Sequence, residues 1–327
     1  MNDVIEVSYT GDVLAHRRCA RAWAYEKYVG FHPYEQVQAM EGRLIHHAME
    51  WMARRYRETR RHVTLDELDQ QLNRYFRVLW ARGLRTAFTS KQETLDRVKR
   101  NLFPSGRMHP TIKAAIEGAQ HTEYELRAVR KLVKGDFAGK SRLLLTGVLD
   151  LVVQQQDPLV YKRVWRWKDR SKLEGDVAVE TLPAKQNDLE IWDYKATRAE
   201  TIYKADYVRQ LLTYATLYRE RSGVLPVRCV LFFVNEADRR DDQLLVIPID
   251  AAIVETALAW TLTQVQELRK TAIKFENNPI SVQGITVDVE LVQQCTACGF
   301  RFDCADYASF LKRPNHPDIR LDNVRKN

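Results

Sequence analysis

The sequence predicts an α/β fold in which a mixed central sheet is flanked by helices. Short runs rich in apolar and β-branched residues, typical of strands, gather between residues 122 and 249. Segments with a helical period precede, interrupt and follow these runs, so the core is predicted as a helix, three strands, a helix and a strand. At 327 residues, the chain could form one large domain or two ordinary ones.

The first third of the chain is predicted to be mostly helical. One helix begins near Gly42 and runs to about Tyr56, and the motif from Thr64 to Glu67 resembles a capping box that opens a second helix. Pro104, Ser105 and Gly106 should break the helical pattern, and Pro110 should restart it. We therefore expect residues 59–120 to form a helical insertion or subdomain.

The remainder is predicted to alternate between strands and helices. Strands are expected at 122–134 and 141–153, with the turn between them at Gly135, Asp136 and Gly139. The further strands are expected at Leu189–Lys195, 227–234 and 244–249, and the helices at 205–220 and 251–270.

Residues 154–188 are expected to interrupt the sheet. They contain Trp165 and Trp167 together with six Lys or Arg residues between positions 162 and 172. Interleaved aromatic and basic side chains suit single-stranded nucleic acid, because the rings can stack on bases. A solvent-exposed hairpin explains the same pattern and is the simpler interpretation.

The overall composition is that of a globular protein, with 45% hydrophobic and 29% charged residues. No apolar run approaches the length of a membrane span, and the N-terminal residues lack the pattern of a signal peptide. We therefore expect a cytoplasmic protein with no membrane partner.

The formal net charge is +8. Residues 74–113 contain ten Lys or Arg and two acidic residues, which accounts for the whole excess. Such a concentration indicates a polyanionic partner, although a solvated helix face explains it equally well. The candidate nucleic-acid contacts in this segment are Arg74, Arg77, Arg82, Arg85, Lys99 and Arg100.

The strand Leu189–Lys195 ends with an acidic residue and a lysine separated by one position. Asp193 and Lys195 should project from the same face, because side chains alternate along a strand. A carboxylate beside an ammonium group can hold a divalent cation and position a water molecule next to it. By itself the pair is a common surface ion pair worth about 0–1 kcal/mol, so it needs partners from elsewhere in the chain.

Four further residues are candidate partners. His46 lies on a predicted helix, Asp150 on a predicted strand, and Gln210 and Tyr214 one turn apart on the following helix. Each has an ordinary explanation as a structural or surface residue. Asp150 is nevertheless surrounded by Val and Leu, and would need a charged partner if it were buried. The order and spacing of the set indicate a common site.

Together these residues resemble the PD-(D/E)XK nuclease superfamily, specifically its RecB-like branch. The motifs of that branch are Gly-x-x-x-His, Gly-x-x-Asp, acidic-x-Lys and Gln-x-x-x-Tyr, and they are matched here by Gly42 and His46, Gly147 and Asp150, Asp193 to Lys195, and Gln210 and Tyr214. The resemblance spans about residues 40–235 and implies a restriction-endonuclease-like core. Position 193 carries Asp rather than the commoner Glu, which the family pattern permits.

The resemblance also implies a reaction and its residues. Asp150, Asp193, the carbonyl of Tyr194 and His46 would hold Mg²⁺ or Mn²⁺. Lys195 would orient and help to deprotonate the attacking water, rather than serve as a partner for Asp193. Gln210 and Tyr214 would contact the DNA backbone or support Lys195, and they complete the implied catalytic set.

The implied function is that of a metal-dependent DNA nuclease, acting as an exonuclease on single strands or duplex ends. It would serve DNA processing, recombination or repair, CRISPR adaptation or phage defence. The chain lacks helicase motifs, so a helicase or integrase partner would be a separate protein encoded nearby. A homo-oligomer is compatible with the sequence.

The cysteines form a second pattern. Cys295, Cys298 and Cys304 follow a Cys-x₂-Cys-x₅-Cys spacing, and Cys19 lies near the other end of the chain. In a cytosolic protein this favours a metal site over disulfides, and zinc bound by four thiolates is the generic option. Cys229 lies within the predicted strand 227–234 and is most simply a buried core thiol.

The cysteine pattern extends the family resemblance. It resembles the iron–sulfur RecB-like nucleases, which include the nuclease domain of the AddB subunit and the small nuclease of CRISPR adaptation. The resemblance implies a [4Fe–4S] cluster on these four cysteines, acting as a staple between the N-terminal and C-terminal segments.

We therefore expect a single nuclease domain over residues 1–327. Its parts would be an N-terminal cluster segment (1–40), a helical basic insertion (59–120), a catalytic sheet core (121–250) and a C-terminal helix with the cysteine cluster (251–327). Two alternatives stay open. A catalytically silent DNA-binding or assembly subunit could keep the same fold, whereas an iron–sulfur electron carrier would leave the acidic and lysine residues unexplained.

Overall fold

The structure is a computed structural model that describes residues 4–30, 37–84, 86, 90–131, 142–157, 159–196, 204–236, 243–278, 282, 295, 298 and 304. The chain divides into two units. The first comprises Met1–Val13 and Glu35–Glu267, and the second comprises Leu14–Tyr34 and Leu268–Asn327. Among the helices of the described residues, none is both long and apolar enough to cross a membrane.

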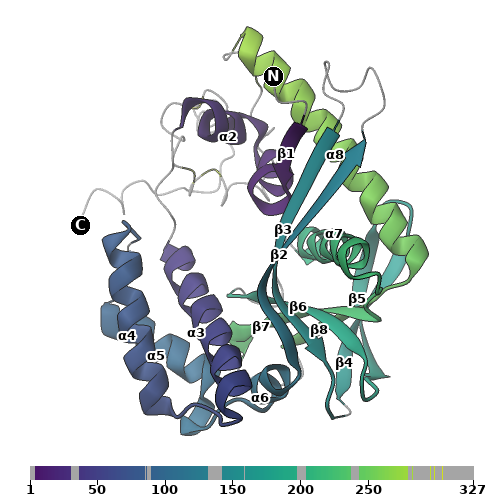
Figure 1. Cartoon of the computed structure of the whole chain (residues 1–327). Coiled ribbons are helices and arrows are strands. Elements are labelled where there is room, and N and C mark those ends of the chain that lie inside the picture. The colour runs from purple at the N-terminus through teal and green to yellow at the C-terminus, as the bar shows by residue number, and fades with distance from the viewer. Residues whose placement is uncertain are drawn as a thin grey trace, which may run out of the picture. The chain divides into compact units, whose positions relative to one another are not determined.

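Helices dominate the first third of the chain and strands the middle (Figure 1). The elements before the sheet core are β1 (Val4–Ser8), the π-helix η1 (Tyr9–Leu14), α1 (Ala15–Arg18), α2 (Ala20–Ala24), the π-helix η2 (Tyr25–Val29), α3 (Val37–Thr59), α4 (Leu65–Ala81), α5 (Lys91–Leu102), the 3₁₀-helix η3 (Pro104–Gly106) and α6 (Pro110–Glu117). Those that follow are β2 (Ala119–Lys131), β3 (Arg142–Gln154), β4 (Val160–Asp169), β5 (Glu174–Pro183), β6 (Leu189–Lys195), α7 (Lys204–Ser222), β7 (Arg228–Phe233), the 3₁₀-helix η4 (Val234–Glu236), β8 (Leu244–Pro248) and α8 (Ala251–Asn277).

The strands form one mixed sheet in the order β1-β3-β6-β7-β8-β4-β5, and β2 pairs with the other edge of β3. β1 runs parallel to β3 and β6 parallel to β7, whereas β3 with β6 and β7 with β8 are antiparallel. The α/β fold with a mixed central sheet flanked by helices is therefore confirmed. The core order of helix, three strands, helix and strand is found as α3, then β2, β3 and β6, then α7 and β7.

Local sequence signals account for several element boundaries. The Thr64 hydroxyl accepts a hydrogen bond from the Glu67 backbone, and the Glu67 carboxylate accepts one from the Thr64 backbone, so the predicted capping box opens α4. Pro110 begins α6, where its fixed φ suits the first helical position. The turn predicted at Gly135, Asp136 and Gly139 lies outside the described residues.

The segment expected to interrupt the sheet instead extends it. β4 and β5 form an antiparallel hairpin, and Val164 of β4 pairs with Val246 of β8. Trp165 is only 3% exposed, and its ring packs edge-to-face on Trp167 with centroids 6.1 Å apart. The buried Trp165 therefore has no open face on which a base could stack, so the prediction that it contacts nucleic acid is wrong. Trp167 is half-exposed.

The two faces of the sheet are covered by different helices. Trp192 and Tyr194 of β6 pack into the apolar core that contains residues of α3, α4, α5 and α6. α7 lies against the other face, where the buried Cys229 thiol of β7 donates a hydrogen bond to the Leu211 carbonyl. Because side chains alternate along β6, Asp193 and Lys195 are directed toward the α7 side.

The second unit joins segments from the two ends of the chain. Trp23 and Ala24 of α2 share a small apolar core with Leu268 and Phe275 of α8. The Arg21 guanidinium also donates a hydrogen bond to the carbonyl of Val282, with Nε and O 2.9 Å apart. The N-terminal and C-terminal segments of this unit thus fold against each other.

The two motif glycines differ in their surroundings, which predicts opposite effects of substitution on stability. A Cβ at Gly147 would lie 2.5 Å from Cε1 of Tyr214, whereas a Cβ at Gly42 would meet only the Cβ of Ala196 at 3.8 Å. Gly147→Ala should therefore lower the free energy of unfolding by about 1–3 kcal/mol through overpacking. Gly42→Ala, inside α3, should raise it by up to about 1 kcal/mol.

Urea unfolding of both variants beside the unmodified protein checks this prediction. Equal stability of the two alanine variants would contradict the packing of Tyr214 on β3.

Candidate active site

The candidate site lies where β3 changes its pairing partner. β3 pairs with β1 up to Thr146 and with β6 from Leu151 onward. β1 and β6 share one edge of β3, because β2 occupies the other edge. Among the described strands, none pairs with residues 147–150 on that edge. The register of β3 with β6, continued by one step beyond Leu151 and Trp192, brings Asp150 opposite Asp193. Two carboxylates therefore meet at the fork between the strands.

Asp150 is held from two sides. Its Oδ2 accepts a hydrogen bond of 2.7 Å from the backbone N–H of Tyr194, and its Oδ1 lies 3.2 Å from Nδ1 of His46 on α3. Burial disfavours the charged carboxylate, but His46, Lys195 and the Tyr194 N–H outweigh it, so the pKa of Asp150 lies below its ordinary value. Burial likewise opposes the charged imidazole, but Asp150 and Glu123 raise the pKa of His46 to about 10.

Asp193 and Lys195 form a buried ion pair, with Nζ and Oδ2 2.5 Å apart. Burial raises the pKa of Asp193 to about 6, although the Lys195 ammonium opposes the rise. Burial also disfavours the charged lysine, but the carboxylates of Asp193 and Asp150 prevail, so the pKa of Lys195 is raised. Lys195 is therefore a protonated partner of Asp193. The sequence interpretation had favoured a water-positioning role for Lys195 over this ion pair.

The predicted Gln210 and Tyr214 belong to the surroundings of Lys195. Gln210 accepts a hydrogen bond from Lys195 through Oε1 at 3.1 Å, and its amide donates to the Tyr214 hydroxyl at 3.1 Å. The Lys195 ammonium also lies 4.5 Å from the centre of the Tyr207 ring. Gln210 and Tyr214 are both buried, so this geometry favours support of Lys195 over contact with a DNA backbone.

Two residues of the site were missed from the sequence. Thr10, just after β1, accepts a hydrogen bond from Gln210 at 3.0 Å and lies 3.1 Å from the Tyr214 hydroxyl. Glu123 of β2 approaches His46, with Oε1 3.6 Å from Nδ1. Neither belongs to a recognisable motif, and only the pairing of β1 and β2 with β3 brings them to the site.

Glu123 has an unusual backbone conformation for a strand residue. Its φ is 46°, in the left-handed region that side chains other than glycine seldom adopt. Such a conformation costs of order 1–3 kcal/mol, and residues that keep it gather at functional sites.

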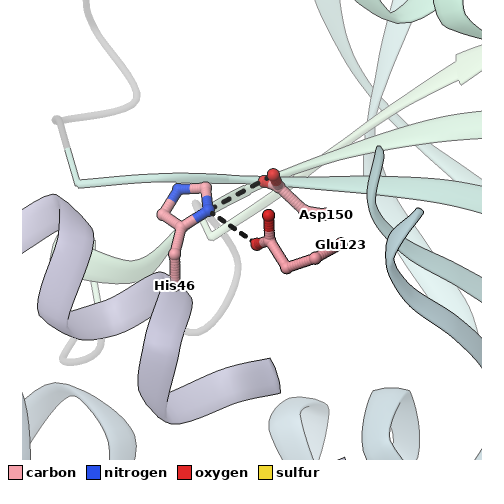
Figure 2. Close-up of side chains that lie close together, drawn as sticks. All are labelled: His46, Glu123 and Asp150. Carbon is pink, nitrogen blue, oxygen red and sulfur yellow. Dashed lines mark ion pairs between the residues drawn. The ribbon is translucent and has the colours of Figure 1, made fainter. Parts of the chain in front are cut away.

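These residues surround one hollow of about 430 Å³. Those lining it include Thr10, His46, Glu123, Gly147, Asp150, Asp193, Lys195, Gln210 and Tyr214. Figure 2 shows that the carboxylates of Glu123 and Asp150 approach the same ring nitrogen of His46. Donor atoms of these three side chains lie within 4.8 Å of one another. Carboxylate oxygens with one imidazole nitrogen are a donor set that suits Mg²⁺ or Mn²⁺.

Comparison with protein families agrees with this geometry. The family model described as the PD-(D/E)XK nuclease superfamily matches residues 13–186 and 173–305, which together cover most of the chain. The chain belongs to the PD-(D/E)XK nuclease superfamily. The predicted superfamily is thus confirmed. A search of curated proteins found no match.

The structure divides the basic residues predicted to contact nucleic acid. Arg74, Arg77 and Arg82 lie exposed on and just beyond the C-terminal half of α4, and Arg100 is exposed on α5. Lys99 is instead engaged by two carboxylates, Asp69 at 2.7 Å and Asp96 at 2.8 Å. Arg85 lies outside the described residues.

In the second unit, two of the four candidate ligand cysteines have an N–H donor near the sulfur. Arg21 lies 3.5 Å from Sγ of Cys304, and the backbone N–H of Ala22 lies 3.5 Å from Sγ of Cys19. The backbone N–H of Cys298 donates to the carbonyl of Cys295 at 3.2 Å.

The pKa of His46 predicts how the metal-free protein responds to pH. Because folding raises this pKa from its ordinary 6.5 to about 10, the stabilisation from charged His46 is fully present below about pH 6.5 and disappears as the pH rises through 10. The melting temperature of chelator-treated protein should exceed that of His46→Gln most at pH 6, and the difference should shrink toward pH 10. A difference that widened with pH would contradict a charged His46.

Proposed function

We propose that this chain is a metal-dependent deoxyribonuclease of the RecB-like branch, acting as an exonuclease on single-stranded DNA or duplex ends. The observation that carries the proposal is the meeting of Asp150, Asp193 and Lys195 beside residues 147–150 of β3, which no described strand pairs with on the edge toward β6. Buried acids beside a fixed ammonium, in a hollow reached from solvent, are suited to hydrolysis of a phosphodiester.

His46, Asp150, Asp193 and the carbonyl of Tyr194 would hold the cation, Mg²⁺ or Mn²⁺. When bound, it would stabilise the negative charge that develops on the phosphate and acidify a bound water. The carboxylates fit this task because their own positions are set by protein contacts. The Tyr194 N–H orients Asp150, and Lys195 orients Asp193.

Lys195 would position the attacking water as a hydrogen-bond donor. Its raised pKa keeps it protonated, which favours the role of an oriented cation over that of a proton acceptor. Gln210 and the Tyr207 ring hold the ammonium at 3.1 and 4.5 Å, so its direction is set before a substrate arrives. Thr10 and Tyr214 support this arrangement through Gln210.

Cys19, Cys295, Cys298 and Cys304 would bind a [4Fe–4S] cluster as a structural staple. The segments that carry them belong to one unit, and Arg21, two residues after Cys19, contacts the sulfur of Cys304. Four thiolates are also a ligand set for zinc, which the experiment below distinguishes.

The proposed biological setting is the one that the resemblance to RecB-like nucleases implies. The exposed Arg74, Arg77, Arg82 and Arg100 would contact DNA phosphates, in a process such as recombination, repair, CRISPR adaptation or phage defence. A helicase or integrase encoded nearby would supply or receive the DNA, and a homo-oligomer is compatible with this role.

A nuclease assay tests the central proposal. With Mg²⁺ or Mn²⁺, the full chain should shorten end-labelled single-stranded or duplex DNA. Asp150→Asn and Lys195→Met should each reduce the rate at least about 100-fold, because each removes charge at the reacting phosphate. Asp176→Asn, which changes an exposed carboxylate on the β4–β5 hairpin, is the matched control and should keep full activity.

Two results would contradict the assignment. Full activity of the Asp150→Asn and Lys195→Met variants would place catalysis elsewhere. DNA binding without cleavage under both metals would favour a catalytically silent DNA-binding subunit.

The cluster proposal has its own test. Protein purified without oxygen should be brown, with charge-transfer absorption near roughly 400 nm and about four iron atoms per chain. Replacement of Cys19, Cys295, Cys298 or Cys304 by serine should remove the absorption and lower the melting temperature, whereas Cys229→Ser should keep the absorption, because Cys229 is buried in β7. Colourless protein that contains one zinc ion per chain would contradict the cluster proposal and indicate a zinc site instead.

A further inference from the structure

The Glu123 carboxylate lies outside every motif of the site, yet it faces the centre of the site. Its Oε1 lies 3.6 Å from Nδ1 of His46, and the Oδ1 of Asp150 lies 3.2 Å from the same nitrogen (Figure 2). Two carboxylates that converge on one nitrogen repel each other unless a positive charge lies between them. The His46 imidazole supplies at most one positive charge for the two carboxylates, so a divalent cation would be favoured at this point.

The backbone of β2 explains why the Glu123 side chain points toward His46. Thr122 pairs with Leu151 and Tyr124 with Leu149, so the register puts Glu123 opposite Asp150. At Glu123 itself the ladder is interrupted by the positive φ of 46°. The side chain is thereby brought to His46, and 35% of it stays accessible, so that an ion can reach it from solvent.

Negative charge is in excess around Glu123 and Asp150 in the hollow. Of the described residues that line it, Lys195 is the only Lys or Arg, and its ammonium is engaged by Asp193 at 2.5 Å. Within the hollow, Glu123 therefore has only the imidazole of His46 as a cationic neighbour, and Asp150 has His46 and a share of the Lys195 charge. A divalent cation would supply the missing charge.

We propose that Glu123 is a metal ligand, and that it binds a divalent transition-metal ion together with His46 and the Oδ1 of Asp150. The inference rests on the proposed function and adds a carboxylate to its metal site. The donor atoms of the three side chains lie within 4.8 Å of one another, so one ion could contact all three. One nitrogen with two carboxylates favours Mn²⁺ over Mg²⁺.

Titration with Mn²⁺ alone, without DNA, tests the assignment through the electron paramagnetic resonance signal of the free ion. Glu123→Gln should weaken Mn²⁺ binding at least about tenfold. Glu180→Gln is the matched control, since it makes the same change on β5, where the carboxylate is ion-paired with Arg166 at 2.5 Å and does not line the hollow. Its Mn²⁺ affinity should equal that of the unmodified chain. Asp150→Asn should lose binding altogether.

The outcomes separate this inference from the proposed function. If Asp150→Asn loses Mn²⁺ and Glu123→Gln binds it as the unmodified chain does, Glu123 is not a ligand, while the metal-dependent nuclease stands. If the unmodified chain itself binds no Mn²⁺ and cleaves no DNA, both proposals fail.

A second variant distinguishes a metal ligand from a structural partner of His46. Glycine adopts a positive φ without strain, so Glu123→Gly removes the carboxylate and the backbone strain together. Under the proposal, the metal-free variant melts at or above the temperature of the unmodified protein, while its Mn²⁺ affinity falls as in Glu123→Gln. A lower melting temperature with unchanged Mn²⁺ affinity would contradict the proposal and show that the Glu123 carboxylate has a structural role.

Discussion

The change of partner along β3 is the constraint on which the site depends. A strand that leaves one neighbour before it joins the next exposes backbone groups that must find other partners. Here the N–H of Tyr194 donates to the Asp150 side chain, at the point where pairing with β6 has ended. The carboxylate thus closes the fork between the strands and is itself fixed by it. The same gap leaves room for the hollow in which the other site residues meet.

Two acidic residues on β6 show how the surroundings separate a structural role from a chemical one. Glu190 is fully buried, and its Oε2 accepts hydrogen bonds from Gln155, Tyr161 and Trp192 at 2.6–2.7 Å. Asp193, three residues further on, lines the hollow and has the Lys195 ammonium as its close partner. Glu190 has these three donors and the Arg228 guanidinium at 3.3 Å, which commit it to the core, whereas Asp193 could exchange its contact with Lys195 for a metal.

The site also concentrates unfavourable features that the rest of the fold must offset. Glu123 keeps a strained backbone, and Asp150, Asp193 and Lys195 are all removed from water. Burial of charge costs several kcal/mol per ion before pairing, and ion pairs seldom recover more than that. The extensive apolar core between α3, α4, α5, α6 and the sheet supplies the compensating stability. Such a distribution is typical of proteins whose function requires charged groups in a fixed geometry.

The sequence by itself determined the fold class, most element boundaries and the residues of the recognised motifs. Those features depend on local patterns: apolar periodicity defines β6 and α7, and short spacings link Asp193 with Lys195 and Gln210 with Tyr214. Thr10, Glu123 and the burial of Trp165 were decided only by the tertiary structure. Register between strands distant in sequence brings Glu123 opposite Asp150, and no local pattern encodes that register. The ion pair of Lys195 with Asp193 likewise depends on burial, because removal from water holds the two charges together.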